Sequence, residues 1–435
     1  MFEVMGIIKK SWLQGDLFLW KAQEKSVEYE AGVFKGYKTE EATGYGLRVI
    51  RQDGRMGFYA SNGPLEGREL VEKALEMSEF GEKALFEIPS YPSVLEWKNF
   101  VDPKVEHIEV REMVELGEYI VTRIREEYPE VLVNLEIVAG LEERSLYNHH
   151  EEKLDFARTS FQIAVSVNRT AEDDILEIYA ERSWGSRDVD VEDLLQELKR
   201  KIEFSKHLIS MGSGRYPVIF TPQGALVLLY PLLYGLNGKN ILFGRSPLKD
   251  RFGKVVFSSL FSLIEVSHEP WTLGSCPFDD EGVVTQKEQF IVENGKLENG
   301  FFDLWSAARL GRVPGGHGFR AFYHELPEPG FGALRVKNGL RDRETLVEEL
   351  EEGLIVDSVL GLGQSNVASG AFSCGIQLGF YVKGGEIQGR VKDVMVSGNV
   401  YHALQNIKEL SRDDRWIYGK MLLPYILVEP LEIET

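Results

Sequence analysis

Residues 27–60 read VEYEAGVFKGYKTEEATGYGLRVIRQDGRMGFYA, in which runs of β-forming residues flank short polar turns. One turn contains Asp53 and Gly54, and an Asp-Gly pair between β-rich runs predicts a hairpin because such turns favour positive φ angles. A helix is then expected over about residues 67–80. The sequence therefore predicts an N-terminal α+β unit that covers residues 1–88.

A stretch with three prolines, residues 89–103, predicts the end of this first unit. Beyond it, apolar residues recur at three- and four-residue spacing from Val110 to Ile124, which predicts a helix with one buried face. Strand-like segments follow, and Asp190 is placed to cap a further helix. These elements predict a central α+β unit over residues 104–210.

The composition of the chain changes after Gly-Ser-Gly at 212–214, and glycines and β-forming residues dominate from there onward. Asn-Gly at 294–295 and Gly-Gly at 384–385 predict two further hairpins, and a helix is expected near residues 343–352. The order of elements lacks the βαβα rhythm of a parallel doubly wound sheet. We therefore predict an α+β fold whose large C-terminal domain, residues 215–435, is rich in β-strands.

The chain is acidic: among its 435 residues, 69 are Asp or Glu and 49 are Lys or Arg, a formal net charge of −20. This charge repels phosphate backbones, and no Lys/Arg cluster is long enough to form a basic face, so nucleic acid is not an expected direct ligand. No stretch reaches the ~20 apolar residues of a membrane-spanning helix, and the N-terminus lacks the apolar segment of a signal peptide. The two cysteines, Cys276 and Cys374, have no CxxC spacing and fit a reducing compartment. We therefore expect a soluble cytoplasmic protein without a membrane association.

Three groups of residues combine histidine with other side chains that can bind a metal. They are His149 with His150, His268 with Glu269 and Cys276, and His317 with His324 and Glu325. None of them has the helical spacing typical of a catalytic zinc pair, and adjacent residues of a strand point to opposite faces. A solvated or hydrogen-bonded loop histidine is therefore the simpler interpretation of each group. Cys374 lacks any neighbouring feature that would lower the pKa of its thiol, which favours a buried structural role.

Four segments resemble, in order, the signatures of the TldD/PmbA family, whose older label is modulator of DNA gyrase. The segments are GYGLRVI at 44–50, FDDEG at 278–282, DLWSAARLG at 303–311 and SGAFS at 369–373. Each segment is weak evidence alone, but their common order from about residue 26 to the C-terminus is specific. The resemblance implies proteolysis of peptides or unfolded proteins by a complex of two related subunits.

The TldD type of this family carries an HExxxH helix whose histidines bind zinc together with a distant cysteine, while the glutamate acts as the general base. When the chain is aligned on its GLNG sequence at 235–238, the corresponding positions hold Leu229, Tyr230 and Tyr234. Leucine has no donor atom, tyrosine is neutral near pH 7, and Tyr230 cannot replace a carboxylate base. No HExxH or HExxxH sequence occurs in the chain. The resemblance therefore implies the PmbA/TldE type, with no catalytic residue, metal or cofactor of its own.

The resemblance also implies partners, either a TldD-type subunit that holds the zinc or a second copy of this chain in a homodimer. Because glycine- and β-rich segments can offer edge strands to an extended peptide, we expect two segments to lie near a shared substrate cleft. Their residues are Asp279, Asp280, Glu281, Gly282, Gly370, Phe372 and Ser373. The equally simple interpretation is that both segments are turns that define the fold.

Two other functions are compatible with the sequence. The chain could be a self-associating peptide-binding or regulatory protein without protease activity. It could also be a stand-alone hydrolase that uses ligands such as His317 and His324. Stoichiometric metal in the purified chain would favour the hydrolase, whereas a companion TldD-type gene in the same genome would favour the protease subunit.

Overall fold

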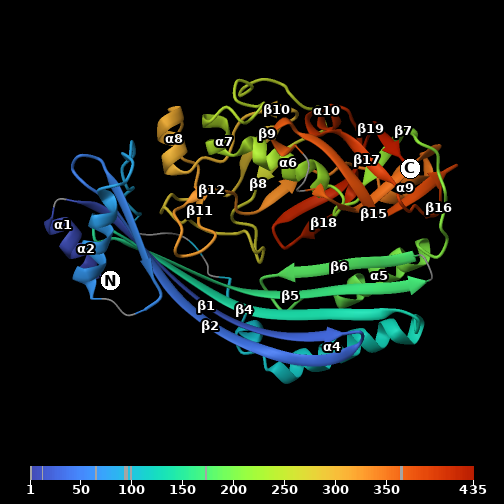
Figure 1. Ribbon diagram of the computed structural model, residues 1–435, viewed down its shortest axis with the longest axis horizontal. Coiled ribbons are helices and arrows are strands. Elements are labelled where there is room, and N and C mark those ends of the chain that lie inside the picture. Colours follow the sequence, from blue (N-terminus) through green and yellow to red (C-terminus); the bar gives the residue numbers. More distant parts are fainter. Residues whose placement is uncertain are drawn as a thin grey trace.

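Two sheets make up most of the molecule: a long antiparallel sheet on one side and a larger mixed sheet on the other (Figure 1). The computed structural model describes residues 2–11, 13–63, 66–92, 97, 100–171, 174–362 and 366–435. Part of the proline-containing stretch, residues 93–96, 98 and 99, therefore lies outside the described residues. The predicted α+β class and the β-rich C-terminal region are confirmed.

The first sheet has the strand order β3-β2-β1-β4-β5-β6. Its strands are β1 (Gln14–Glu30), β2 (Val33–Ile50), β3 (Met56–Ser61), β4 (Leu132–Asn148), β5 (Lys153–Ala171) and β6 (Asp174–Trp184). The predicted hairpin joins β2 to β3, where Ile50 pairs with Met56 and Gly54 has a φ of 87°. A further hairpin, which the sequence did not predict, joins β1 to β2, where Ala31 and Gly32 have φ angles of 51° and 75°. Alanine is not a typical turn residue, so the Ala31-Gly32 pair did not indicate a turn in the sequence.

The long strand β1 joins the two predicted N-terminal units into one sheet. It pairs with β2 on one side and with β4 on the other, and Asp16 lies opposite Asn148. The predicted units 1–88 and 104–210 thus contribute strands to the same sheet, whereas the sequence suggested separate α+β units. The difference arises because pairing between strands more than a hundred residues apart leaves no local pattern in the sequence.

Two amphipathic helices cover a face of the first sheet. α4 (Val110–Glu127) and α5 (Val191–Phe204) bury apolar residues in a common core with β4, β5 and β6, as their periodicity predicted. Asp190 caps α5 by accepting a hydrogen bond from the backbone N–H of Asp193 at 2.9 Å, which confirms the predicted start of this helix. The short α3 (Pro103–Glu106) precedes α4.

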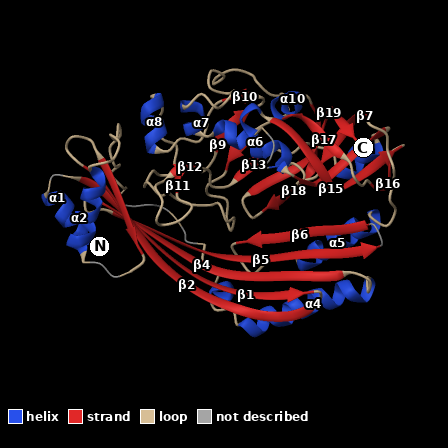
Figure 2. Cartoon of the chain, in the orientation of Figure 1, coloured by secondary structure: helices blue, strands red, loops and turns tan. Residues whose placement is uncertain are grey.

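Two further helices, α1 (Phe2–Lys10) and α2 (Gly67–Ser78), pack together at the other end of this sheet (Figure 2). The backbone of α2 approaches β3 very closely at Gly57. A Cβ atom at Gly57 would lie 2.0 Å from the carbonyl oxygen of Ala74. Glycine at this position is therefore what allows the helix to lie against the strand.

The second sheet has eleven strands in the order β10-β9-β8-β13-β19-β17-β15-β14-β7, with β16 beside β15 and β18 beside β19. Its strands are β7 (Gly214–Phe220), β8 (Leu263–Glu265), β9 (Gln289–Glu293), β10 (Lys296–Leu297), β13 (Leu334–Val336), β14 (Glu352–Leu360), β15 (Ala371–Lys383), β16 (Glu386–Arg390), β17 (Met395–Asn399), β18 (Ile407–Ile417) and β19 (Met421–Glu434). β11 (Gly318–Phe319) and β12 (Glu328–Pro329) form a separate pair. Because β7 pairs with both β14 and β19, five strands form a closed cycle of pairings.

The hairpins predicted in this domain are present. Asn294 and Gly295, with φ angles of 45° and 81°, join β9 to β10. Gly384 and Gly385, with φ angles of 61° and 77°, join β15 to β16. The predicted helix near residues 343–352 is also present, as α9 (Arg343–Glu348). The turn chemistry of these segments was thus sufficient to locate them.

The remaining helices lie on or within the C-terminal domain. They are α6 (Leu226–Leu236), α7 (Gly238–Leu242), α8 (Leu304–Leu310), α10 (Val400–Gln405) and the 3₁₀ turn η2 (Val367–Ser369). Within the described part of the chain, none of the helices combines the length and the apolar character that crossing a bilayer requires.

We expect Gly57→Ala to lower the free energy of unfolding by about 2–3 kcal/mol, because the added methyl group must displace the backbone of α2. The measurement is urea unfolding followed by circular dichroism. The matched control is Gly36→Ala in the same sheet, where a Cβ atom would have no neighbour within 4 Å. Equal stability of the two variants would contradict the close approach of α2 to β3.

Candidate functional site

The three positions that the sequence aligned with a zinc motif lie together on α6. Leu229 is fully buried, at 0% exposure, among the apolar side chains of the C-terminal core. Tyr230, the next residue along the helix, is 50% exposed. Tyr234 is half-buried one turn further along. The helix therefore uses the first of these positions for packing and directs the second to the surface.

These side chains do not fit a zinc ion. Zinc in proteins takes thiolate, imidazole or carboxylate ligands, and α6 offers none of these at Leu229, Tyr230 or Tyr234. Among the described residues, no group of three or more His, Cys, Asp or Glu side chains is arranged to hold a metal. The geometry of α6 is that of a core helix with an exposed tyrosine.

One predicted cleft residue, Gly370, lies close to the C-terminal half of α6. The link is Tyr401 of α10, whose ring occupies the space that a Cβ atom at Gly370 would need, at 2.5 Å. The hydroxyl of Tyr401 likewise lies 2.2 Å from the position of a Cβ atom at Gly235 in α6. Phe372 is buried in the same core, whereas the side chain of Ser373 is exposed on β15. The structure thus brings the glycine-containing turn and the helix together.

The acidic predicted segment, 279–282, has a different environment. Gly282 has a φ of 81° and packs against Tyr91, which follows the first sheet's helix α2 in sequence. The side chains of Asp279, Asp280 and Glu281 are all buried. A Cβ atom at Gly370 would contact Tyr401, whereas one at Gly282 would contact Tyr91, so the two predicted cleft segments have different surroundings.

Glu281 is part of a buried ionic cluster that joins the C-terminal domain to the first sheet. Its Oε1 atom lies 2.7 Å from Nη1 of Arg48 in β2. The Nη2 atom of Arg48 lies 2.5 Å from Oδ2 of Asp16 in β1. A parallel contact joins Asp280 to Arg144 in β4 at 2.9 Å. The acidic loop is therefore a docking element between the two sheets.

Asp279 organises the acidic loop itself. Its Oδ1 atom accepts hydrogen bonds from the backbone N–H groups of Glu281 at 3.0 Å and Val283 at 2.9 Å. Its Oδ2 atom accepts from the N–H of Gly318 at 2.8 Å. These contacts favour the interpretation of the segment as a turn that defines the fold, and contact of its carboxylates with a peptide stays a prediction.

Burial dominates the electrostatics of this cluster. Burial raises the pKa of Asp279 well above its ordinary value, and the neighbouring charge of Glu281 adds to this effect. Burial also raises the pKa of Glu281, although Arg48 opposes the shift. Burial alone would lower the pKa of Arg48, but Asp16 and Glu281 outweigh it and the pKa is raised. The arginine is thus held in its charged form between two carboxylates.

Four of the predicted ligand histidines take part in local contacts. His317 is buried with its Nε2 atom 2.7 Å from Oε2 of Glu265, a partner that no sequence spacing indicated. His268 contacts the hydroxyl of Thr285 at 3.1 Å. The ring centroids of His149 and His150 lie 3.9 Å apart. Burial of His149, together with the charge of His150, lowers the pKa of His149.

Both cysteines are buried, which agrees with the structural role predicted for Cys374. Burial raises the pKa of the Cys276 thiol to about 12. A thiol with a raised pKa is a poor nucleophile at neutral pH.

Family comparisons agree with the order of motifs in the sequence. Residues 213–435 match the family described as PmbA/TldA metallopeptidase C-terminal domain. Residues 15–78 match the family described as PmbA/TldA metallopeptidase domain 1.

The chain is also similar to individual relatives and to a solved structure. An uncharacterised protein of Methanocaldococcus jannaschii is 25% identical over 98% of this chain and 97% of its own length. The metalloprotease PmbA homolog of Haemophilus influenzae is 32% identical, but over 47% of this chain and 42% of its own length. The crystal structure of TldE from Thermococcus kodakarensis superposes with a TM-score of 0.91 at 20% identity, covering 100% of this chain and 99% of that one. This structural similarity shows the shared fold.

We expect Glu281→Gln to lower the free energy of unfolding by about 3 kcal/mol, because it leaves Arg48 with one carboxylate partner in a buried site. Thermal and urea unfolding measure the loss. The control is Glu288→Gln, which removes an exposed carboxylate 2.8 Å from Arg335 and should change stability by less than about 1 kcal/mol. The docking role of the acidic loop is wrong if both substitutions have the same small effect.

Proposed function

Because the chain belongs to the PmbA/TldD metallopeptidase family, we propose that it is the zinc-less subunit of a protease complex. In this proposal the zinc and the general base belong to a TldD-type partner subunit. The complex hydrolyses peptides or unfolded proteins. This chain contributes part of the surface that holds the substrate.

The observation that carries the proposal is the composition of α6. A protease that uses zinc needs three protein ligands and a base beside the metal-bound water. The helix instead has Leu229 packed in the core and Tyr230 at the surface. A leucine in a core position stabilises the helix by burying its side chain, and a ligand there would lose that packing. Leu229 thus contributes packing and offers no metal ligand.

The strand arrangement supports the peptide-binding part of the proposal. β3 and β6 form the two edges of the first sheet, and an extended peptide can add to such an edge through main-chain hydrogen bonds. This mode requires little sequence specificity, which suits unfolded substrates.

The test compares this chain, a TldD-type subunit and their mixture for zinc content and for hydrolysis of an unfolded protein such as casein. We expect the chain alone to be inactive, and the mixture to exceed the activity of the TldD-type subunit by several-fold. A TldD-type subunit whose HExxxH glutamate is changed to glutamine should leave the mixture inactive, because the base is then absent.

Two outcomes contradict the proposal. If the chain alone binds about one zinc per molecule and cleaves casein, its active site lies elsewhere. If the chain binds casein as a stable homodimer and never associates with the TldD-type subunit, it is a peptide-binding regulatory protein.

A further inference from the structure

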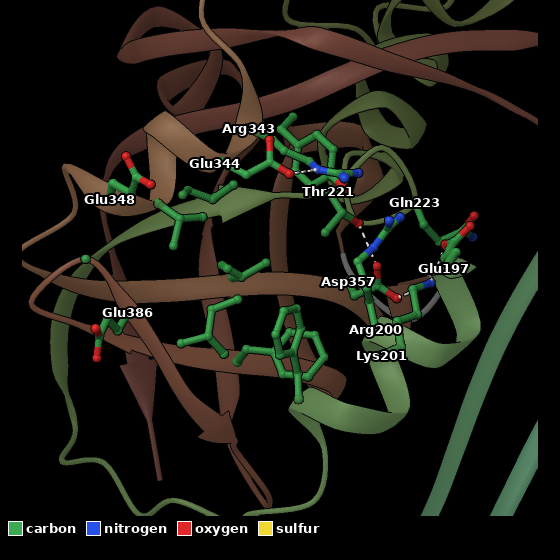
Figure 3. Close-up of a pocket in the computed structure, with 18 of the residues that line it drawn as sticks. Glu197, Arg200, Lys201, Thr221, Gln223, Arg343, Glu344, Glu348, Asp357 and Glu386 are labelled. Carbon is green, nitrogen blue, oxygen red and sulfur yellow. Dashed lines mark hydrogen bonds and ion pairs between the residues drawn. The ribbon is translucent and has the colours of Figure 1, made fainter. Parts of the chain in front are cut away.

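A cavity of about 390 Å³ lies between α5 and the C-terminal domain (Figure 3). Its walls come from both halves of the molecule, since α5 covers the first sheet while β7, β14 and β15 belong to the second. The volume falls within the range of pockets that hold small molecules in proteins. The cavity is separate from α6 and from the acidic loop, because no residue of either lines it.

The middle of the cavity is apolar. The side chains that form it are Phe204, Ile219, Val347, Ile355, Phe380 and Ile387. The rings of Phe204 and Phe380 meet edge to face, with centroids 5.7 Å apart, and give this part a rigid wall. Such a wall favours an apolar ligand group of similar size, which leaves water when it binds.

Charged side chains at the α5 end of the cavity are mostly paired with one another. Lys201 lies 2.8 Å from Glu197 and 2.8 Å from Asp357. Asp357 also accepts a hydrogen bond from the hydroxyl of Thr221 at 2.9 Å. Arg415 pairs with Glu197. These side chains are paired with one another, so they form a polar wall of the cavity and are not left to bind a ligand.

Arg200 is the exception at this end. Its half-buried side chain makes no hydrogen bond or ion pair with any residue that the structure describes. Burial and the nearby charge of Arg343 lower the pKa of Arg200 from its ordinary value, but an arginine stays charged at neutral pH. Among the described residues no carboxylate forms an ion pair with this guanidinium, although the charge of Glu197 acts on it. A ligand carboxylate is the matching group.

The opposite end of the cavity carries carboxylates. Figure 3 shows Glu348 and Glu386 across the apolar middle from Arg200 and Lys201. Both glutamates are exposed, and neither has an ion pair with a described residue. An anionic group would be repelled here, whereas an ammonium group would be attracted. The cavity thus has Arg200 at one end and two carboxylates at the other, with apolar side chains between them. The paired Arg343 and Glu344 also line it.

We propose that this cavity binds a short apolar peptide with free termini. Its carboxyl terminus contacts the guanidinium of Arg200, its apolar side chains pack between Phe204 and Phe380, and its amino terminus faces Glu348 and Glu386. The site is distinct from a cleft that would hold a protease substrate. It gives the protein a means to sense small peptides, and it does not depend on the zinc-less subunit assignment.

The test measures binding of the tripeptide Leu-Leu-Phe to the full-length chain by isothermal titration calorimetry. We expect amidation of the peptide's carboxyl terminus to weaken binding by about tenfold or more, because a charge-assisted hydrogen bond to Arg200 is lost. Acetylation of its amino terminus should weaken binding by a smaller factor, since the glutamates at the rim are solvated.

Three variants assign these effects to residues. Arg200→Gln should bind the free and the amidated peptide equally, without a change in thermal stability, because Arg200 makes no hydrogen bond or ion pair with any described residue. Glu348→Gln combined with Glu386→Gln should abolish the difference between the free and the acetylated peptide. The matched control is Lys199→Gln, which removes a neighbouring charge on α5 that pairs with Glu127 outside the cavity.

Several results would overturn the proposal. One is no binding of the free peptide at about 10 mM, a concentration that detects even weak affinity. Another is equal binding of the free and amidated peptides by the unmodified protein. Tighter binding of decanoate than of the tripeptide would assign the cavity to fatty acids, because decanoate has a carboxylate but no ammonium group.

Discussion

The buried contact between Arg48, Asp16 and Glu281 fixes how the two halves of the molecule fit together. Removing three charges from water is costly, and the cost is offset only when the charges meet in a suitable geometry. The geometry requires that β1, β2 and the acidic loop of the C-terminal domain take one relative position. The contact between Arg144 in β4 and Asp280 imposes the same relative position on the two halves. The cavity beside α5 also has walls from both halves of the molecule.

The sequence predicted local features well and distant ones poorly. The hairpins at Gly54, Gly295 and Gly384 and the cap at Asp190 were located because turn and cap chemistry is written in a few adjacent residues. The single sheet that residues 1–88 and 104–210 form was not predicted, because the pairing of distant strands depends on the whole fold.

For the candidate site, too, the sequence predicted the local motif but not its distant contacts. The family motifs pointed to the acidic segment, but only the structure identifies its partners, such as Arg48 in β2. A charged residue between the apolar Leu47 and Val49 was the one available signal, since a buried arginine needs a carboxylate. The cavity had no sequence signal at all, because Arg200 on α5 and Glu386 on β16 meet it from distant segments.

The closed cycle of strands in the C-terminal domain also bears on how the protein is made. β7 pairs with β19, which follows it by roughly 200 residues in the sequence. At ribosomal rates of about 5–20 residues per second, β7 waits about 10–40 s for this neighbour to be synthesised. Val218 and Phe220, which are buried in the folded protein, lack the contacts of β19 in that interval. The nascent chain therefore has a prolonged window in which a chaperone can bind it.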